Sequence, residues 1–344
     1  MDPRFSNKVY PRRDNVFQHK KSLNFDLVRS KVYVERERSH SIVLMEWLAF
    51  ALVGVFTGLT ASIMSNLEDK VTVFRRNQAD DIIGGSTDDN LVGAWLFFTG
   101  ISVCFVLTSS IMTVYYGPGA NGSGVAELMG YLNGINYPNV IGFETFVTKV
   151  FGVVLAVVGG LCVGKEGPLA HIGANIGAVV CYLPFSSFAW FRTDTMKRNL
   201  IAAGTSAGVS AAFGAPVGGT LFAFEISKPN TFWKFSVIWK VFLSCALSVF
   251  TLAVVQSLMA GDSISQTSSA VLKFGEIDIN PPTIEVIPGS IFTGAICGVL
   301  GGIFVLVNSN LGLLRKKYIN SNWKKLTEAV IFSIMTTTCF FWIP

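Results

Sequence analysis

The sequence predicts an all-α, polytopic membrane protein. Of its 344 residues, 51% are hydrophobic and only 14% are charged, a composition typical of chains that cross a bilayer several times. The hydrophobic residues gather into long runs, and glycine-rich breaks separate the shorter ones. Irregular backbone at bilayer depth occurs only where it is buried in protein or lines a wet cavity. The breaks therefore indicate a transport pathway.

Six apolar segments are long enough, or nearly so, to cross a hydrocarbon core about 30 Å thick. They cover residues 42–64, 91–115, 146–163, 234–259, 287–307 and 326–343. Four further segments are too short or too rich in glycine to cross alone. They cover residues 125–133, 168–183, 199–213 and 215–226. We therefore expect spanning helices combined with broken, re-entrant helices.

The N-terminal residues 1–40 form a polar segment in which lysine and arginine outnumber acidic residues ten to five. The positive-inside rule places this segment in the cytosol. An exposed, acidic loop is predicted at about 65–90, on the opposite side of the membrane. We expect the membrane domain to cover residues 41–344, with a first part at about 41–260 and a second part beginning at about 285. No nucleic-acid partner is expected, because no binding fold accompanies the basic segment.

Enzymatic and metal-binding functions find no support in the sequence. The six cysteines lie in apolar segments without a CxxC pair, so we expect packing residues and neither disulfides nor a metal site. Residues 117–122 match GxGxxG, but they follow a membrane span instead of a β-strand. Residues 159–165 resemble a P-loop, yet the next residue is Glu166 where Mg²⁺ binding needs serine or threonine. No cofactor is expected.

The most informative residue is Glu166, within the segment Gly164-Lys165-Glu166-Gly167-Pro168. Residues 151–163 before it carry no charge, and residues 169–183 after it carry only His171. A carboxylate at bilayer depth is costly and marks an ion or proton path by default. The glycines and the proline break the backbone, and a new helix is expected to start at Pro168. Since a helix N-terminus attracts anions, a carboxylate there suggests a gate.

A second glycine-flanked helix start lies at Gly122-Ser123-Gly124, before a short helix expected from Val125. Its glycines expose backbone N–H groups, and Ser123 adds a hydroxyl donor. An alternative is that both segments are only packing glycines with a serine N-cap. Their occurrence together with an intramembrane glutamate favours an anion pathway in which both helix starts point at one ion.

The polar residues beside this predicted site have structural interpretations as well. Lys165 either offsets Glu166 or faces a polar vestibule. A packed, hydrogen-bonded role is favoured for His171 over a proton relay. Glu225, at the end of another helix rich in small residues, is interpreted as an acceptor for backbone N–H groups of a neighbouring loop.

These motifs resemble the CLC family of chloride channels and proton-coupled chloride exchangers. Residues 122–126 look like the family's GSGIP loop, and Gly164–Pro168 is identical to its GKEGP signature. Residues 197–219 are similar to the stretch that follows. The segments 272–275 and 298–302 look most like the endosomal and lysosomal eukaryotic branch. The resemblance covers roughly residues 22–344 and implies an inverted-repeat architecture, with the first half present and the second half truncated.

The resemblance also implies roles for individual residues. Ser123 and its glycines Gly122 and Gly124 would contact a central chloride ion, with Gly164, Lys165, Gly167 and Pro168 around Glu166 contributing to the same site. Glu166 would be the gate that competes with the anion. The protein is then expected to be a homodimer, or a dimer with a full-length relative, in an endosomal, lysosomal or other intracellular membrane.

Three departures from the family pattern bear on mechanism. Exchangers carry paired glutamates where this chain has Glu225-Ile226, so the internal proton acceptor is lost at Ile226. We therefore expect voltage-gated-channel-type, passive chloride transport. A proton-coupled antiporter remains an alternative. The early end of the second half favours a second alternative, in which the chain is a truncated, non-conducting modulatory subunit. In addition, Val125-Ala126 replaces Ile-Pro, which removes a preset helix start with a modest expected effect.

Overall fold

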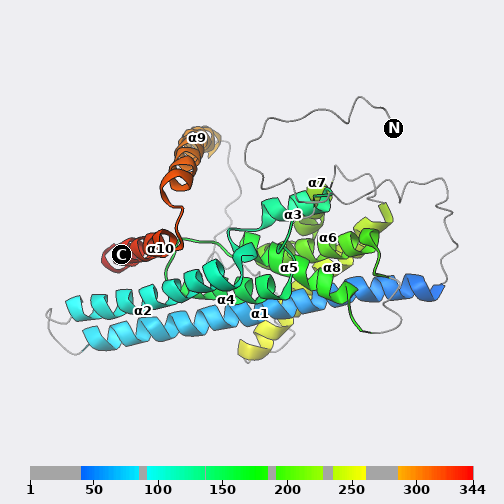
Figure 1. Cartoon of the computed structure of the whole chain (residues 1–344), viewed down its shortest axis with the longest axis horizontal. Coiled ribbons are helices and arrows are strands. Elements are labelled where there is room, and N and C mark those ends of the chain that lie inside the picture. Colours follow the sequence, from blue (N-terminus) through cyan, green and yellow to red (C-terminus); the bar gives the residue numbers. More distant parts are fainter. Residues whose placement is uncertain are drawn as a thin grey trace. The chain divides into compact units, whose positions relative to one another are not determined.

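The computed structural model describes residues 40–84, 91–135, 137–184, 191–227, 235–260 and 286–343 (Figure 1). The predicted cytosolic segment 1–40 lies almost wholly outside the described residues, as does the segment 272–275. The helices, in chain order, are α1 (His40–Ile83), α2 (Leu91–Ile111), η3 (Met112–Tyr116), η4 (Pro118–Ala120), α3 (Val125–Leu132), α4 (Phe143–Val158), α5 (Glu166–Cys181), α6 (Asp194–Phe213), α7 (Pro216–Ser227), α8 (Phe235–Ala260), α9 (Val286–Tyr318) and α10 (Asn322–Trp342).

The all-α prediction is confirmed, since the described residues form helices and no strand. Four helical segments are long and apolar enough to cross a membrane. They are Ile42–Ile83, Leu91–Tyr116, Ser236–Met259 and Val286–Tyr318. The four short segments also form helices, α3, α5, α6 and α7, at the predicted places. The described residues therefore combine spanning and broken helices, but two of the six predicted spans are not among the four: the segment 146–163 forms α4 of only 16 residues, and the segment 326–343 lies in α10.

The predicted loop at 65–90 is wrong over most of its length. Helix α1 continues through 44 residues to Ile83, so it includes the charged stretch that was interpreted as a loop. No glycine or proline interrupts the chain between Gly58 and Gly84, and lysine, arginine and glutamate are good helix formers. Only the two glycines at 84 and 85 supply a stop signal. Charge alone was therefore a poor indicator of where this helix ends.

Other helix boundaries also differ from the prediction. Helix α6 begins five residues earlier, at Asp194, and α9 extends to Tyr318 instead of 307. Two further differences lie near Glu166. The span expected at 146–163 ends at Val158, because Gly159 and Gly160 follow and Gly160 adopts a left-handed φ of 78°. Helix α5 begins at Glu166, two residues before the predicted start at Pro168. Glu166 is thus itself in the first helical turn, where a negative side chain is favoured by the helix dipole.

The chain forms two compact units, which are described separately. The first unit holds Pro118–Phe146, Glu166–Leu252 and the described residues up to Ala61. The second unit holds Ser62–Gly117, Val147–Lys165 and the described residues from Ala253 onward.

Glycines pack α5 tightly against α6 in the first unit. A Cβ atom at Gly173 would overlap the carbonyl oxygen of Gly204, and a Cβ atom at Gly204 would overlap that of Gly173. Gly177 meets Leu200 in the same way, and Gly208 meets Leu169. Glycines four residues apart on both helices let the backbones approach closely, which is how small residues drive helix association in membranes. Almost every residue of α5 after Pro168 is buried as a result.

We expect Gly204→Ala to separate α5 from α6 and to destabilise the protein by about 2–3 kcal/mol, because the added methyl group meets rigid backbone. Thermal unfolding in detergent measures this effect. Gly100→Ala is the matched control, since a Cβ atom at Gly100 on α2 has no atom within 4 Å. That control should unfold at or above the wild-type temperature. Equal melting temperatures for the two variants would contradict the packing argument.

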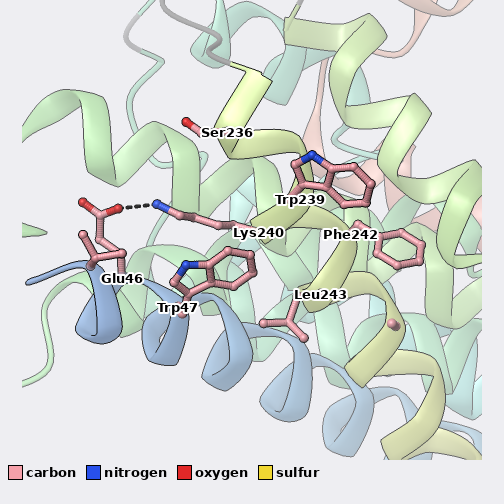
Figure 2. Close-up of a pocket in the computed structure, with 9 residues that line it drawn as sticks. Glu46, Trp47, Ser236, Trp239, Lys240, Phe242 and Leu243 are labelled. Carbon is pink, nitrogen blue, oxygen red and sulfur yellow. Dashed lines mark hydrogen bonds and ion pairs between the residues drawn. The ribbon is translucent and has the colours of Figure 1, made fainter. Parts of the chain in front are cut away.

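Helices α1 and α8 run side by side in the first unit. Ser244 Oγ donates to the carbonyl of Phe50 at 2.8 Å, and Gly54 and Gly58 leave room for the backbone of Ser244 and Ser248. At the start of both helices the buried Glu46 carboxylate accepts a hydrogen bond from the buried Lys240 ammonium (Figure 2). This ion pair lies beside a pocket of about 640 Å³ that Trp47, Trp239 and other apolar side chains line.

All six cysteines are free. The packing role predicted for them holds for Cys181 and Cys245, which are buried. It is wrong for the other four, which are exposed on the described structure. An apolar segment in a membrane protein has lipid-facing as well as protein-facing positions, so hydrophobic context alone does not separate the two.

Candidate functional site

The loop before α3 presents Ser123 at the surface of the first unit. Gly122 and Gly124 flank it with φ angles of 67° and 83°, left-handed values that favour glycine. Gly124 is the N-cap residue of α3. The backbone N–H of Val125 donates to Ser123 Oγ at 3.4 Å, so the hydroxyl hydrogen remains available to another acceptor. The loop therefore exposes a hydroxyl donor next to a helix N-terminus.

The start of α5 meets this loop directly. A Cβ atom at Gly167 would lie 2.7 Å from Ser123 Cβ and 3.6 Å from Ser123 Oγ. The absence of a side chain at Gly167 is what allows the two segments to touch. The structure therefore brings the two glycine-flanked helix starts together, as their patterns predict.

His171 supports the loop from the next turn of α5. The ring is fully buried, and its Nε2 lies 2.6 Å from the carbonyl oxygen of Val140. A carbonyl only accepts, so Nε2 carries the hydrogen and donates it. A Cβ atom at Gly124 would overlap the His171 ring. His171 is thus a packed, hydrogen-bonded residue, which confirms the interpretation favoured from the sequence.

Glu166 is the first residue of α5, and its side chain is exposed. It lies next to Gly167, which contacts Ser123, and so belongs to the same short stretch of backbone. Unpaired N–H groups at a helix start favour a negative charge, whether from a side chain or from a bound ion. Glu166 and an anion near Ser123 can therefore compete for one favourable environment.

Lys165 pairs with a residue that the sequence analysis did not consider. Its ammonium lies 3.0 Å from the Glu68 carboxylate and 3.1 Å from Ser65 Oγ, both on α1 in the second unit. Lys165 thus offsets Glu68. Gly164 belongs to the second unit as well and is exposed. Pro168 is the third residue of α5 and is partly buried.

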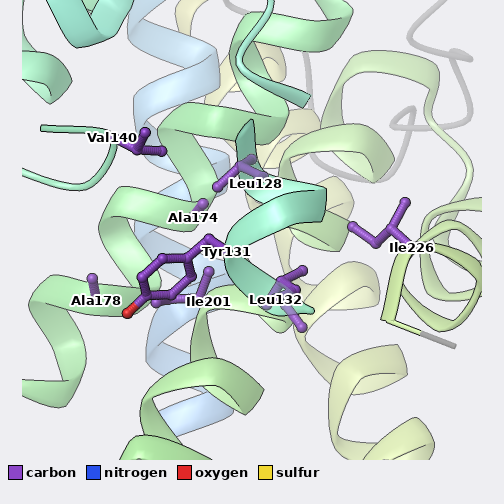
Figure 3. Packing of buried hydrophobic residues seen from close by; sticks show 9 residues of the cluster. Leu128, Tyr131, Leu132, Val140, Ala174, Ala178, Ile201 and Ile226 are labelled. Carbon is purple, nitrogen blue, oxygen red and sulfur yellow. The ribbon is translucent and has the colours of Figure 1, made fainter. Parts of the chain in front are cut away.

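Ile226 lies in a hydrophobic cluster at the end of α7 (Figure 3). It is 5% exposed, and its carbonyl accepts a hydrogen bond from Asn133 Nδ2 at 2.9 Å. The other buried members of the cluster are Leu128, Tyr131, Leu132, Val140, Ala174, Ala178, Ile201 and Ala202. This surrounding is apolar, and no group of the Ile226 side chain can carry a proton. The neighbouring Glu225 is exposed.

Comparison with known proteins identifies the family. Residues 104–344 match the sequence model of the voltage-gated chloride channels. The chain belongs to this family, the CLC family. It is 34% identical over 351 residues to H⁺/Cl⁻ exchange transporter 7 of Mus musculus, covering 97% of this chain and 44% of that protein. Chloride channel protein A of Dictyostelium discoideum is 30% identical over 331 residues, covering 92% of this chain and 37% of that protein.

Solved CLC structures share the fold. A slow cyanobacterial Cl⁻/H⁺ antiporter superposes with a TM-score of 0.69 at 21% identity, over 85% of this chain and 63% of that one. A eukaryotic CLC transporter gives a TM-score of 0.68 at 21% identity, over 87% of this chain and 50% of that one. The chain thus spans less than half the length of the curated relatives it matches. The family and the fold resemblance inferred from the sequence are confirmed.

Proposed function

We propose that this chain is a membrane part of a chloride transport protein in which Ser123 and the starts of α3 and α5 bind the anion. The observation that supports this most directly is the close approach of Gly167 to Ser123. A Cβ atom added at Gly167 would lie only 2.7 Å from Ser123 Cβ. Two helix N-termini at one place provide N–H groups and partial positive charge without a fixed cation. A monovalent anion can bind there and still leave, which transport requires.

In this mechanism Glu166 is the gate. Its carboxylate occupies the environment that chloride needs, and it leaves that environment when it is protonated or when chloride displaces it. Gly122 and Gly124 keep the Ser123 loop open, while Gly167 and Pro168 shape the start of α5. Gly164 and Lys165 form the segment directly before α5. The Lys165–Glu68 ion pair restricts the movement of this segment.

We further propose that chloride transport is passive. Tight proton coupling needs a second titratable group on the inner proton path, and the position where exchangers carry one is Ile226. Ile226 is 5% exposed, and the described hydrophobic residues that pack around it carry no carboxylate. The names of relatives favour the other candidate, because the curated proteins that this chain resembles include H⁺/Cl⁻ exchange transporters. Coupled exchange is therefore the second candidate function.

Simultaneous recording of chloride efflux and proton uptake from liposomes that contain the protein tests the two candidates. Passive transport predicts chloride flux without proton movement against its gradient. Uphill proton uptake driven by a chloride gradient would instead establish exchange. An absence of chloride flux above that of protein-free liposomes would contradict both for this chain.

The partners and the location follow from the same proposal. We propose chloride as the transported ligand, without a cofactor, and a membrane domain that begins near residue 41. The basic N-terminal segment would lie in the cytosol. The protein would form a homodimer, or a dimer with a full-length relative, in an endosomal, lysosomal or other intracellular membrane. Native mass spectrometry of the protein extracted from cells distinguishes the two kinds of dimer.

A further inference from the structure

A buried arginine lies outside the Ser123 site, in the second unit. Arg75 on α1 is 8% exposed, whereas its neighbour Arg76 is exposed. The helical rise places Arg75 about 12 Å before the end of α1 at Ile83. A buried guanidinium is costly unless its charge and its N–H groups are matched.

The protein matches this charge only in part. Arg75 Nη1 donates to Ser102 Oγ at 2.8 Å, and the guanidinium lies 4.2 Å above the ring of Phe98. Arg75 Nε is buried and has no acceptor. Within the described ranges, Arg75 forms no ion pair, and the Glu68 carboxylate, earlier on the same helix, pairs with Lys165. The site thus has one positive charge more than it has negative charges.

Two buried hydroxyl groups without hydrogen-bond partners lie on α2 and α10. Thr99 lies on α2 between Phe98 and Ser102, which both touch the guanidinium, and its Oγ1 is buried without a hydrogen-bond partner. Ser102 itself donates to the carbonyl of Phe98, so it orients Arg75 and has no hydrogen left to offer. On α10, Ser333 lies one turn before Thr337, and its Oγ is also buried without a partner.

Gly160 lies beside the guanidinium. A Cβ atom there would lie 3.5 Å from Arg75 Nη1 and 3.1 Å from Thr337 Cγ2. The arginine and the Ser333–Thr337 face of α10 therefore approach one point from two sides. The left-handed φ of Gly160, 78°, makes a larger residue unfavourable at this point.

We propose that Arg75 and Thr99 bind a halide ion against the Ser333–Thr337 face of α10, as a second anion site. A bound monovalent anion would neutralise the positive charge of Arg75. The Arg75 Nε–H and the Thr99 hydroxyl, which have no hydrogen-bond partner, are donors whose hydrogens a halide can accept. The surrounding residues are buried, so the site suits a small spherical ion better than the phosphate of a lipid. The site shares no residue with the Ser123 site and does not depend on whether the chain conducts.

Crystals of the protein grown in bromide provide the first test, because anomalous scattering locates bromide directly. We expect a bromide peak at Arg75 in the wild type and in Ser123→Ala, and none in Arg75→Gln. Arg76→Gln is the matched control, since it removes the same charge from an exposed neighbour, and it should keep the peak. No peak at Arg75 in the wild type would overturn the proposal, as would phosphate-shaped density with an acyl chain.

Thermal unfolding provides a second test that does not depend on Arg75→Gln folding well. An ion that binds only the folded state raises the melting temperature as its concentration rises. We expect bromide to raise it relative to gluconate in a Ser123→Ala background, and Thr99→Val in that background to lose most of the rise. Arg76→Gln in the same background should retain the full rise. An identical response to bromide with and without Thr99→Val in that background would refute Thr99 as a ligand and with it the proposed site.

Discussion

Glu166→Ala should give the largest functional change of any single substitution in this chain. Removing the carboxylate frees the environment at the start of α5 for chloride at every pH and voltage. A competition worth only about 1.4 kcal/mol corresponds to a tenfold change in occupancy. We therefore expect roughly tenfold higher chloride flux at neutral pH and a nearly flat response to acidification. Flux assays in liposomes across a pH series measure both effects.

Two comparisons make this result specific. Glu166→Gln removes the charge but keeps the side-chain size, so it separates electrostatic competition from steric blocking. Glu225→Ala is the matched control, because Glu225 is also an exposed carboxylate in a broken helix and has no part in the proposed gate. It should leave pH dependence unchanged. If Glu166→Ala and Glu225→Ala behave alike, Glu166 is not the gate.

The sequence predicted the helical framework where glycine and proline mark the helix ends. Helix α3 begins at Val125 and α7 ends at Ser227, each within one residue of the prediction. The same signals failed for α1, where no glycine or proline separates the apolar part from the charged part. A charged helix that extends beyond the hydrocarbon core looks like a loop to hydropathy, because hydropathy measures the preference for lipid and not the backbone conformation.

The parts of the candidate site that depend on backbone conformation could be predicted from the sequence. Glycine-flanked helix starts are local signals, and the structure brings Ser123 and Gly167 together. The side-chain partners were not predictable, because they join distant parts of the chain. Lys165 and Glu68 are 97 residues apart. Arg75 was overlooked because it falls in the segment interpreted as an exposed loop. Such pairings depend on which helices pack together, and a single sequence does not give that information.

A second large effect is expected at the buried ion pair of α1 and α8. Lys240→Met should destabilise the protein by about 3–5 kcal/mol, because it removes the ammonium that pairs with the buried Glu46 carboxylate. Both residues are buried, and Lys240 Nζ lies 5.9 Å from the ring centre of Trp47. Thermal unfolding in detergent should show a markedly lower melting temperature.

The double variant Glu46→Gln with Lys240→Met separates the cost of losing the Lys240 ammonium from the net stability that the ion pair contributes. Continuum arguments hold that a buried pair contributes little net stability compared with neutral side chains of similar volume. We therefore expect the double variant to recover most of the stability that Lys240→Met loses. Lys325→Met, at an exposed position on α10, is the control and should change stability by less than about 0.5 kcal/mol. A double variant as unstable as Lys240→Met would show that the lysine acts through packing against Trp47, because removing the carboxylate would then relieve nothing.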